Sequence, residues 1–365
     1  MISLVVPTYN EKDNIRPLVE KIHQSMSRVD NAEYEIVFVD DNSPDGTAEV
    51  VESLSPDYNV RLLLRKDKKG LASAVIDGFS VARGEVLGVI DADLQHPPDI
   101  IPKLLSAIND GADIAIASRY VKGGAVPTWG FLRRLISKGA IMLSRLLLPT
   151  TRNVKDPMAG FFFFRKELID GKPLKPIGYK ILLEILAMTN PKKVTEVPYV
   201  FSDRSSGRSK LGLNTQIGYL KHLFSIMLRN GEALKLGKFC LVGLSGTGVN
   251  TGMLWALVNF AGLQNLIALA ISIETSIISN FLLNDYFTFH EKKLSAPRLL
   301  FRRFLQFNAV SLPGAAINLS VAHVLNSSFG VHYLLSNVIG IAIATLWNYF
   351  LNSWWTWRLQ SELNE

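Results

Sequence analysis

Cysteine is almost absent from this sequence of 365 residues, and Cys240 is its only example. A disulfide framework is therefore excluded. Clusters of basic residues interleaved with stacking aromatics are also missing, which excludes a typical nucleic-acid-binding protein. Charge is scarce at the end of the chain, because only 7 of the 39 Lys and Arg residues and 5 of the 32 Asp and Glu residues follow residue 235. The part before it is mildly basic, which suits an anionic membrane surface or anionic substrates.

The scarcity of charge after residue 235 leaves four long apolar stretches. They lie at about 236–260, 263–287, 304–327 and 332–356. Each has the ~20 residues that a helix needs to cross the hydrocarbon core of a bilayer. The sequence therefore predicts an all-α domain of four transmembrane helices over residues 236–358.

The Lys and Arg residues near these stretches predict the orientation of the protein. The segment that enters the first stretch and the connector between the second and the third are rich in them, whereas the connectors 259–265 and 326–333 contain none. Connectors rich in Lys and Arg remain on the cytoplasmic side of a membrane. We therefore expect both termini and the front domain to be cytoplasmic.

The membrane half contains an internal repeat. Asn280–Phe289 aligns with Asn348–Trp357 at an offset of 68 residues, and the same offset pairs Gly246 with Gly314. Two copies of a two-helix hairpin are therefore expected, with the same orientation in the membrane. The repeated aromatic residues are expected at the cytoplasmic interface, where Trp and Tyr are favoured.

Strands and helices alternate in residues 1–212, which are expected to form one catalytic domain. Apolar strands are predicted at 2–7, 34–40, 60–65, 86–91 and 114–118, with helices between them. This alternation is typical of an α/β fold with a mostly parallel, Rossmann-like sheet. Ligands of such sheets bind outside the carboxyl ends of the strands.

Three of these strands end in polar residues. The motifs are Pro7–Glu11, Asp40-Asp41 and Asp91-Ala92-Asp93. Two carboxylates one residue apart, followed by Gln95, suit a hard divalent cation that keeps open positions for a diphosphate. An acidic pair that only caps the next helix is the alternative for this motif taken alone.

Two helices are predicted to lie at the membrane surface. The segments 129–148 and 213–228 each place apolar residues on one side, and the first places basic residues on another. Basic amphipathic helices lie in the headgroup plane with the apolar side down. An ordinary core-facing helix is the alternative for both. The second helix falls in the segment 213–235, which is expected to link the two domains.

Taken as an ordered set, the motifs of the front domain resemble glycosyltransferase family two enzymes of the GT-A fold. The resemblance is greatest to the polyprenyl-phosphate sugar synthases of the dolichyl-phosphate mannose synthase type. It covers nearly all of residues 1–212, whereas the four-helix region resembles the GtrA-like membrane domain more loosely. The motifs are Val5–Glu11, Val39–Thr47, Asp91–Pro97, Ser118–Tyr120, Asp156–Phe161 and Arg204–Lys210.

The resemblance implies transfer of mannose from GDP-mannose to dolichyl or another polyprenyl phosphate, with inversion and with Mn²⁺ or Mg²⁺ as cofactor. A phosphate monoester has a second pKa of about 6, so the acceptor is ionised at pH 7 and needs no general base. A UDP-glucose or UDP-N-acetylhexosamine donor remains an alternative. So does a lipid-carrier flippase or scaffold. The Gln-x-x-Arg-Trp motif of processive polysaccharide synthases is absent.

The resemblance also assigns residues to the donor. Asp93 and Gln95 are expected to ligate the metal directly, and Asp91 either ligates it or bonds to ribose or sugar hydroxyls. The ring of Tyr9 is expected beside the base. The remaining residues expected around the nucleotide are Pro7, Glu11, Val39, Asp41 and Ala92.

Basic residues are assigned to the phosphates. Arg119, at a strand end, and Arg204 and Lys210, in a Gly- and Ser-rich segment, are expected to grip them. Arg133 and Ser137 are one turn apart on the first amphipathic helix, so they could receive the lipid phosphate at headgroup depth. Asp91, Asp93 and Arg119 are thus the expected catalytic residues.

Two further features are open to a structural interpretation. The aromatic run Phe161–Phe164 could form an apolar wall near the prenyl chain, or a strand buried on both faces. His96 could simply precede the Pro97-Pro98 stop.

Overall fold

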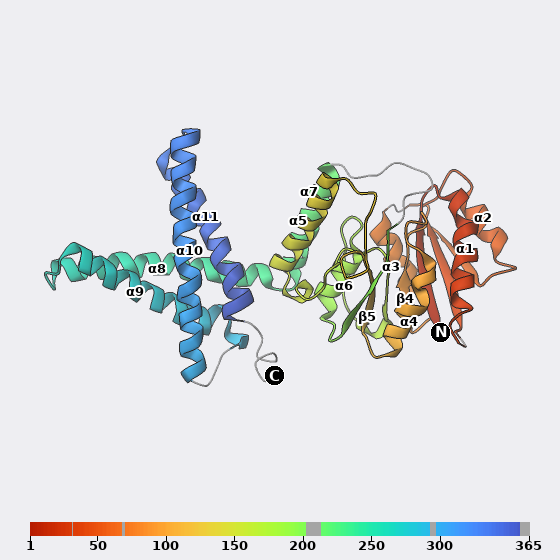
Figure 1. The fold of residues 1–365 in the computed structure, drawn as a ribbon, viewed down its shortest axis with the longest axis horizontal. Helices are drawn as coiled ribbons and strands as arrows, with labels where there is room; N and C mark the ends of the chain where they lie inside the picture. Colours follow the sequence, from red (N-terminus) through yellow and green to blue (C-terminus); the bar gives the residue numbers. More distant parts are fainter. Residues whose placement is uncertain (31, 68–69, 202–212, 293–296, 358–365) are drawn as a thin grey trace. The chain divides into compact units, whose positions relative to one another are not determined.

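The computed structural model describes the chain except for residues 31, 68–69, 202–212, 293–296 and 358–365 (Figure 1). The chain forms two compact units, Met1–Asn230 and Gly231–Glu365. The segment expected to link the domains divides between them. The helix in this segment ends at Arg229 and belongs to the first unit. The second unit begins at Gly231, whose φ is positive.

The first unit is built on one seven-stranded sheet, in the order β3-β2-β1-β4-β6-β5-β7. β6 runs antiparallel to β4 and β5, and the other pairings are parallel, so the mostly parallel sheet is confirmed. The strands are β1 (Ile2–Thr8), β2 (Tyr34–Asp40), β3 (Val60–Leu64), β4 (Val86–Val89), β5 (Ile114–Ser118), β6 (Phe162–Arg165) and β7 (Val194–Pro198).

Helices cover both faces of this sheet, which explains why its strands are apolar on both sides. One core packs α1, α2 and α4 against the sheet, and a second core packs α3 and α6 against the opposite face. The bounds are α1 (Lys12–Met26), α2 (Thr47–Leu54), α3 (Leu71–Val81), α4 (Ile101–Asn109) and α6 (Ile181–Thr189).

The aromatic run Phe161–Phe164 leads into and forms a strand that is buried on both faces, the second of the two interpretations. Phe162, Phe163 and Phe164 belong to β6 and are fully buried, with alternate side chains in the two cores. An apolar wall for a prenyl chain would need exposed rings, so that interpretation is wrong. The sequence patterns predicted neither α6 nor β7.

Two amphipathic helices of the first unit keep their apolar sides exposed. α5 (Phe131–Leu147) and α7 (Leu213–Arg229) lie against each other, and the Tyr219 hydroxyl donates to the Ala140 carbonyl oxygen at 2.6 Å. The core-facing alternative is wrong for the apolar residues that remain exposed, namely Phe131, Leu132, Leu135, Ile136, Ile217, Leu220, Phe224 and Leu228.

A buried ionic cluster holds α7 against α6. Both oxygens of Glu184 accept hydrogen bonds from Arg229, at 2.6 and 2.7 Å, and His222 Nε2 lies 2.9 Å from Glu184 Oε2. Burial alone would raise the pKa of Glu184, but the bonds to His222 and Arg229 outweigh it and lower the pKa to about 2. The carboxylate therefore anchors α7 through its charge.

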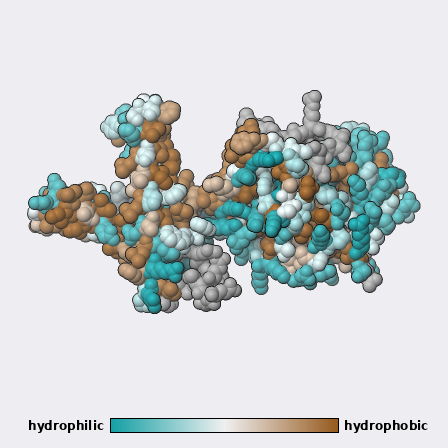
Figure 2. Space-filling view, viewed as in Figure 1, coloured by the Kyte–Doolittle hydropathy of each residue, from teal (hydrophilic) through white to brown (hydrophobic). Residues whose placement is uncertain are grey.

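In the described part of the second unit, four helices are long and apolar enough to cross a membrane, which makes this a multi-pass membrane protein. Figure 2 shows hydrophobic surface along them. The candidate spans are Glu232–Asn259, Asn265–Thr288, Pro297–Phe329 and Tyr333–Thr356. They are formed by α8 (Glu232–Asn259), α9 (Asn265–Leu283), α10 (Pro297–Phe329) and α11 (Tyr333–Leu351), and short π-helical turns follow α9 and α11.

The internal repeat is visible in how these helices pack. α8 packs with α9 and α10 packs with α11, as two hairpins. In each hairpin a glycine, Gly246 or Gly314, lies directly against an asparagine, Asn280 or Asn348, where a Cβ atom would collide. A cavity of about 170 Å³ is lined by pairs at the same offset, including Phe239 with Phe307, Gly243 with Ser311, Ile277 with Thr345 and Asn280 with Asn348.

The repeated aromatic residues divide into two sets. Phe289 and Trp357, which are equivalent in the repeat, are buried and stacked with ring centroids 4.4 Å apart. These two rings therefore pack between the helices, and the expectation that the repeated aromatic residues lie at the cytoplasmic interface stays a prediction. Their neighbours Tyr286, Phe287, Trp354 and Trp355 are exposed.

Candidate active site

The polar strand ends meet at one edge of the sheet, as predicted. Pro7 pairs with Val39 and Thr8 with Asp40 in adjacent parallel strands, and β4 pairs with β1 on its other side. The residues that follow these strands therefore emerge side by side. Tyr9 and Glu11 follow β1, Asp41 follows β2, and Asp91, Ala92, Asp93 and Gln95 follow β4.

The turn after β4 presents a set of oxygen ligands. Leu94 has a positive φ of 60°, which turns the chain sharply between Asp93 and Gln95. Asp93 Oδ1 accepts from the Gln95 backbone N–H at 3.1 Å, so the two residues are held together. Two carboxylates and an amide oxygen are the donors that Mg²⁺ and Mn²⁺ prefer, and they leave positions for a diphosphate. The donor set therefore fits the expected cation.

Asp91, at the start of the same turn, is more exposed than Asp93 and lies beside a buried imidazole. Its Oδ2 atom is 3.3 Å from His96 Nε2, while 32% of the Asp91 side chain stays exposed. The other ring nitrogen, Nδ1, lies 3.0 Å from the hydroxyl of Tyr199, at the end of β7. His96 thus does more than precede a proline stop.

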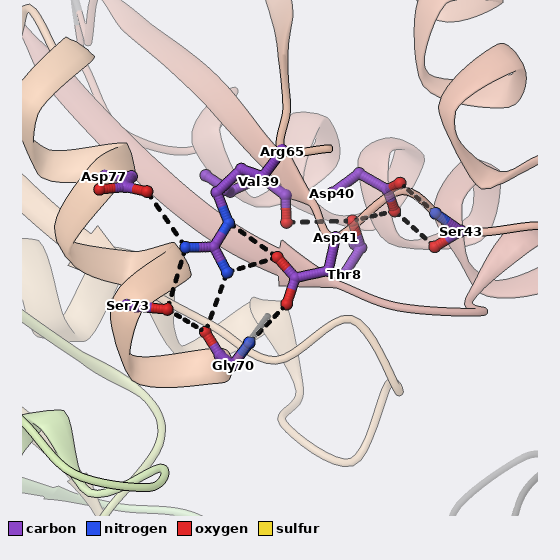
Figure 3. A network of polar contacts seen from close by, with 9 residues as sticks. All are labelled: Thr8, Val39, Asp40, Asp41, Ser43, Arg65, Gly70, Ser73 and Asp77. Atoms are coloured by element: carbon purple, nitrogen blue, oxygen red, sulfur yellow. Dashed lines mark hydrogen bonds and ion pairs between the residues drawn. The ribbon is translucent and has the colours of Figure 1, made fainter. Parts of the chain in front are cut away.

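Asp41 and Asp40 face opposite sides of β2, as adjacent strand residues do. Figure 3 shows Asp40 accepting from Thr8 and Ser43, and Asp41 accepting from Arg65 and the Gly70 backbone N–H. The Arg65 guanidinium uses two nitrogens for Asp41 Oδ1. Among the described residues, Asp41 Oδ2 accepts one bond, from Gly70, and a carboxylate oxygen can accept a second, so it could still accept from a base.

The other residues expected around the nucleoside surround this edge. Pro7 and Val39 are buried at its floor, and the Tyr9 ring is 40% exposed above it. The Glu11 carboxylate accepts from the Asn14 amide at 2.7 Å, and the Glu11 backbone N–H donates to the Thr47 hydroxyl. These residues can form a shallow pocket with one exposed ring.

Arg119 follows β5 and is paired with Asp156, the first residue of a motif to which no role was assigned from the sequence. Its Nε and Nη2 donate to Asp156 at 2.7 and 2.8 Å, and its backbone N–H donates to the same side chain. Burial alone would lower the pKa of Arg119, but the charge of Asp156 outweighs it and raises that pKa. Within the described part of the chain, these bonds to Asp156 leave both N–H groups of Nη1 and the second N–H of Nη2 for a phosphate.

A tryptophan brings a second guanidinium to Arg119. The Arg133 guanidinium lies 4.1 Å from the ring centre of Trp129, and that of Arg119 lies 5.3 Å from it. One turn along α5 from Arg133, the Ser137 hydroxyl accepts from Tyr120 at 2.8 Å. The two residues that helical spacing put forward for the lipid phosphate, Arg133 and Ser137, are therefore near Arg119.

Lys180 is a further basic residue of this cluster that sequence patterns missed. Its Nζ donates to the Met158 carbonyl oxygen at 3.2 Å. Burial and the nearby Arg119 lower the pKa of Lys180 to about 8, although Asp156 and Asp91 oppose the shift. No local motif marks this lysine, because it precedes α6 and comes to the site only through the packing of that helix. The expected phosphate ligands Arg204 and Lys210 lie outside the described residues.

The segment Asp156–Gly160 joins the two halves of the site. Asp156 binds Arg119, Met158 binds Lys180, and Gly160 lies against Asp91 so closely that a Cβ atom would be 2.9 Å from Asp91 Oδ2. The carboxylates after β4 and the basic cluster around Arg119 are thus fixed relative to each other.

Both units of the chain match known proteins. Residues 3–171 match the family model described as Glycosyl transferase family 2, and residues 238–357 match GtrA/DPMS, transmembrane domain. The chain is 47% identical to a dolichol-phosphate mannosyltransferase of Pyrococcus furiosus, over 98% of this chain and 99% of that protein. It is 40% identical to the dolichol-phosphate mannosyltransferase of Saccharomyces cerevisiae, over 60% of this chain and 85% of that protein.

Solved structures share the fold of the first unit. A mannosyl-3-phosphoglycerate synthase from Rubrobacter xylanophilus aligns with a TM-score of 0.50 at 22% identity, over 64% of this chain and 75% of that one. The seven-stranded sheet is therefore a GT-A-like fold, and the four-helix unit is a separate addition to it.

Proposed function

We infer the reaction from the family of the chain. The chain belongs to glycosyl transferase family 2 and to its dolichol-phosphate mannosyltransferases, because it matches such an enzyme over almost its whole length. The proposed donor is GDP-mannose and the proposed acceptor is dolichyl or another polyprenyl phosphate. An acceptor oxygen attacks the anomeric carbon, the bond to the GDP oxygen breaks, and the configuration inverts. The observation that carries this proposal is the segment Asp156–Gly160, which joins an oxygen-ligand turn to a basic cluster.

The donor would bind at the ends of β1, β2 and β4. Asp93 and Gln95 would hold Mn²⁺ or Mg²⁺, with Asp91 as a third ligand or as an acceptor from sugar hydroxyls. The bound cation would neutralise charge on the leaving diphosphate. Tyr9 would stack on the base, and Asp41 Oδ2 would accept from it. Pro7, Glu11, Val39 and Ala92 would complete the pocket.

The acceptor phosphate would bind among Arg119, Arg133, Ser137 and Lys180. It is ionised at neutral pH, so the site needs positive charge and alignment rather than a general base. Arg119 would donate through Nη1 while Asp156 keeps its plane fixed. We also propose Arg204 and Lys210 as phosphate ligands, from the motif alone.

The exposed apolar sides of α5 and α7 would lie in the cytoplasmic headgroup region. Ser137 and Arg133 belong to α5, so a phosphate at headgroup depth would be within their reach. The distribution of Lys and Arg around the spans supports a cytoplasmic first unit.

The test is the substitution Asp93→Ala in the full-length protein. We expect transfer of mannose to a short-chain prenyl phosphate to be lost, while the protein stays folded and membrane-bound. Titration with GDP and UDP, each with Mn²⁺ or Mg²⁺, identifies the base. Normal turnover by Asp93→Ala would refute the assigned metal site, and binding of UDP alone would replace GDP-mannose with a UDP-sugar.

A further inference from the structure

His96 is a buried polar residue enclosed by aromatic rings. Its ring centre lies 5.8 Å from that of Phe161 and 5.5 Å from those of Tyr199 and Phe201. Only 3% of the residue is exposed. The imidazole therefore has one fixed orientation, and its two nitrogens point at fixed partners.

The partners of the two nitrogens determine which of them carries the proton. Nε2 faces Asp91 Oδ2 at 3.3 Å, and an ionised carboxylate only accepts hydrogen bonds. An unprotonated Nε2 would place two acceptors against each other, so the proton belongs on Nε2. Nδ1 is then the acceptor for the Tyr199 hydroxyl at 3.0 Å. Burial raises the pKa of Tyr199, so its hydroxyl keeps the proton that it donates. The chain of contacts runs from Tyr199 through His96 to Asp91.

Gly160 closes this contact from the other side. A Cβ atom at Gly160 would lie 2.9 Å from Asp91 Oδ2 and 3.3 Å from His96 Nε2. The backbone therefore passes directly over the point where the two side chains meet, and only glycine leaves them room. Asp91 Oδ2 therefore lies against both His96 and Gly160.

We propose that His96 is a positioning residue that fixes the Asp91 carboxylate with Oδ1 turned toward the nucleotide sugar and its cation. The proposal rests on the role of Asp91 in the proposed function. His96 itself touches no substrate. Partners that orient a ligand in this way change metal affinity by about 10- to 100-fold when they are replaced.

Two substitutions of His96 separate positioning from packing. The amide nitrogen of glutamine can take the place of Nε2, so His96→Gln keeps a donor for Asp91. Asparagine reaches only to the place of Nδ1, so His96→Asn keeps a partner for Tyr199 and loses the contact with Asp91. Both remove the ring from the same aromatic enclosure. The matched measurements are the Mn²⁺ concentration for half-maximal transfer, the affinity for GDP with Mn²⁺, and the melting temperature, all on the full-length protein in detergent.

We expect His96→Asn to weaken Mn²⁺ activation and GDP binding about 10-fold or more. His96→Gln should restore most of that affinity at a similar melting temperature. In the double variant Asp91→Asn/His96→Asn, the loss should be no larger than in Asp91→Asn, because His96 acts through Asp91.

Equal losses in His96→Asn and His96→Gln, or losses that add to that of Asp91→Asn, would overturn the positioning role. Unchanged affinities in His96→Asn beside a weakened Asp91→Asn would overturn it too, and would leave the proposed function intact. Unchanged affinities in Asp91→Asn would instead remove Asp91 from the proposed donor site.

Discussion

The lowered pKa of Lys180 predicts how the reaction depends on pH. Burial and Arg119 lower this pKa to about 8, so the ammonium loses its charge within an accessible range. Between pH 7 and pH 9 the charged share of Lys180 falls about tenfold. The acceptor phosphate, with a second pKa of about 6, stays fully charged over that range. If the charge of Lys180 binds the acceptor, kcat/KM for the acceptor should fall with it.

Initial rates at saturating GDP-mannose and low concentrations of a short-chain prenyl phosphate measure this quantity. Under these conditions kcat/KM reports groups of the enzyme before the acceptor binds. We expect a fall of about tenfold from pH 7 to pH 9, with a midpoint near the pKa of Lys180. The direction is fixed, because deprotonation removes a positive charge from the site.

The substitution Lys180→Arg is the matched control. A guanidinium keeps its charge throughout this range, so the fall between pH 7 and pH 9 should disappear. Lys180→Met should be weak at every pH, with its loss in KM for the acceptor rather than in GDP binding. An unchanged fall in Lys180→Arg would show that another group titrates, and the reasoning about Lys180 would be wrong.

The remaining predictions concern stability and the division of the chain. The pKa of Glu184 is lowered from its ordinary value of 4.5 to about 2. The ionised carboxylate therefore contributes its full stabilisation above pH 4.5, and this contribution is lost as the pH falls towards 2. Over that pH range the melting temperature should fall more in the wild type than in Glu184→Gln. Gly314→Val should separate α10 from Asn348 and destabilise the second unit by about 1–3 kcal/mol, measured by thermal unfolding. The control is Gly248→Val, which should cause a smaller loss, because a Cβ atom at Gly248 meets nothing within 4 Å. Residues 1–235 alone should still transfer mannose to a short-chain prenyl phosphate in detergent, and a folded but inactive fragment would show that the spans shape the active site.

Much of the catalytic edge could be predicted because its residues follow strands directly. Asp93 and Asp41 are placed by apolar runs that end in polar residues, and parallel strands bring such ends together. The exposed sides of α5 and α7 were also predictable, from apolar residues at helical spacing. These features depend on local sequence and on one general rule of sheet geometry.

The partners of these residues could not be predicted in the same way. Asp156 and Lys180 are 37 and 61 positions from Arg119 along the chain, and no spacing rule connects them. His96 was visible, but its role depends on Tyr199, which directly follows β7, a strand that the patterns did not predict. Such contacts are consequences of tertiary packing, and they decide which side chains of a motif remain available to a ligand.

The reversed direction of β6 explains how the donor and acceptor sides become one site. β6 lies between β4 and β5, and it runs antiparallel to both. Its leading segment, Asp156–Gly160, therefore arrives at the edge where β4 and β5 end, and contacts Asp91 on one side and Arg119 on the other. A parallel β6 would place Arg165 at that edge instead, and neither contact could form. A single antiparallel strand in a parallel sheet is thus what fixes the carboxylates relative to the phosphate-binding cluster.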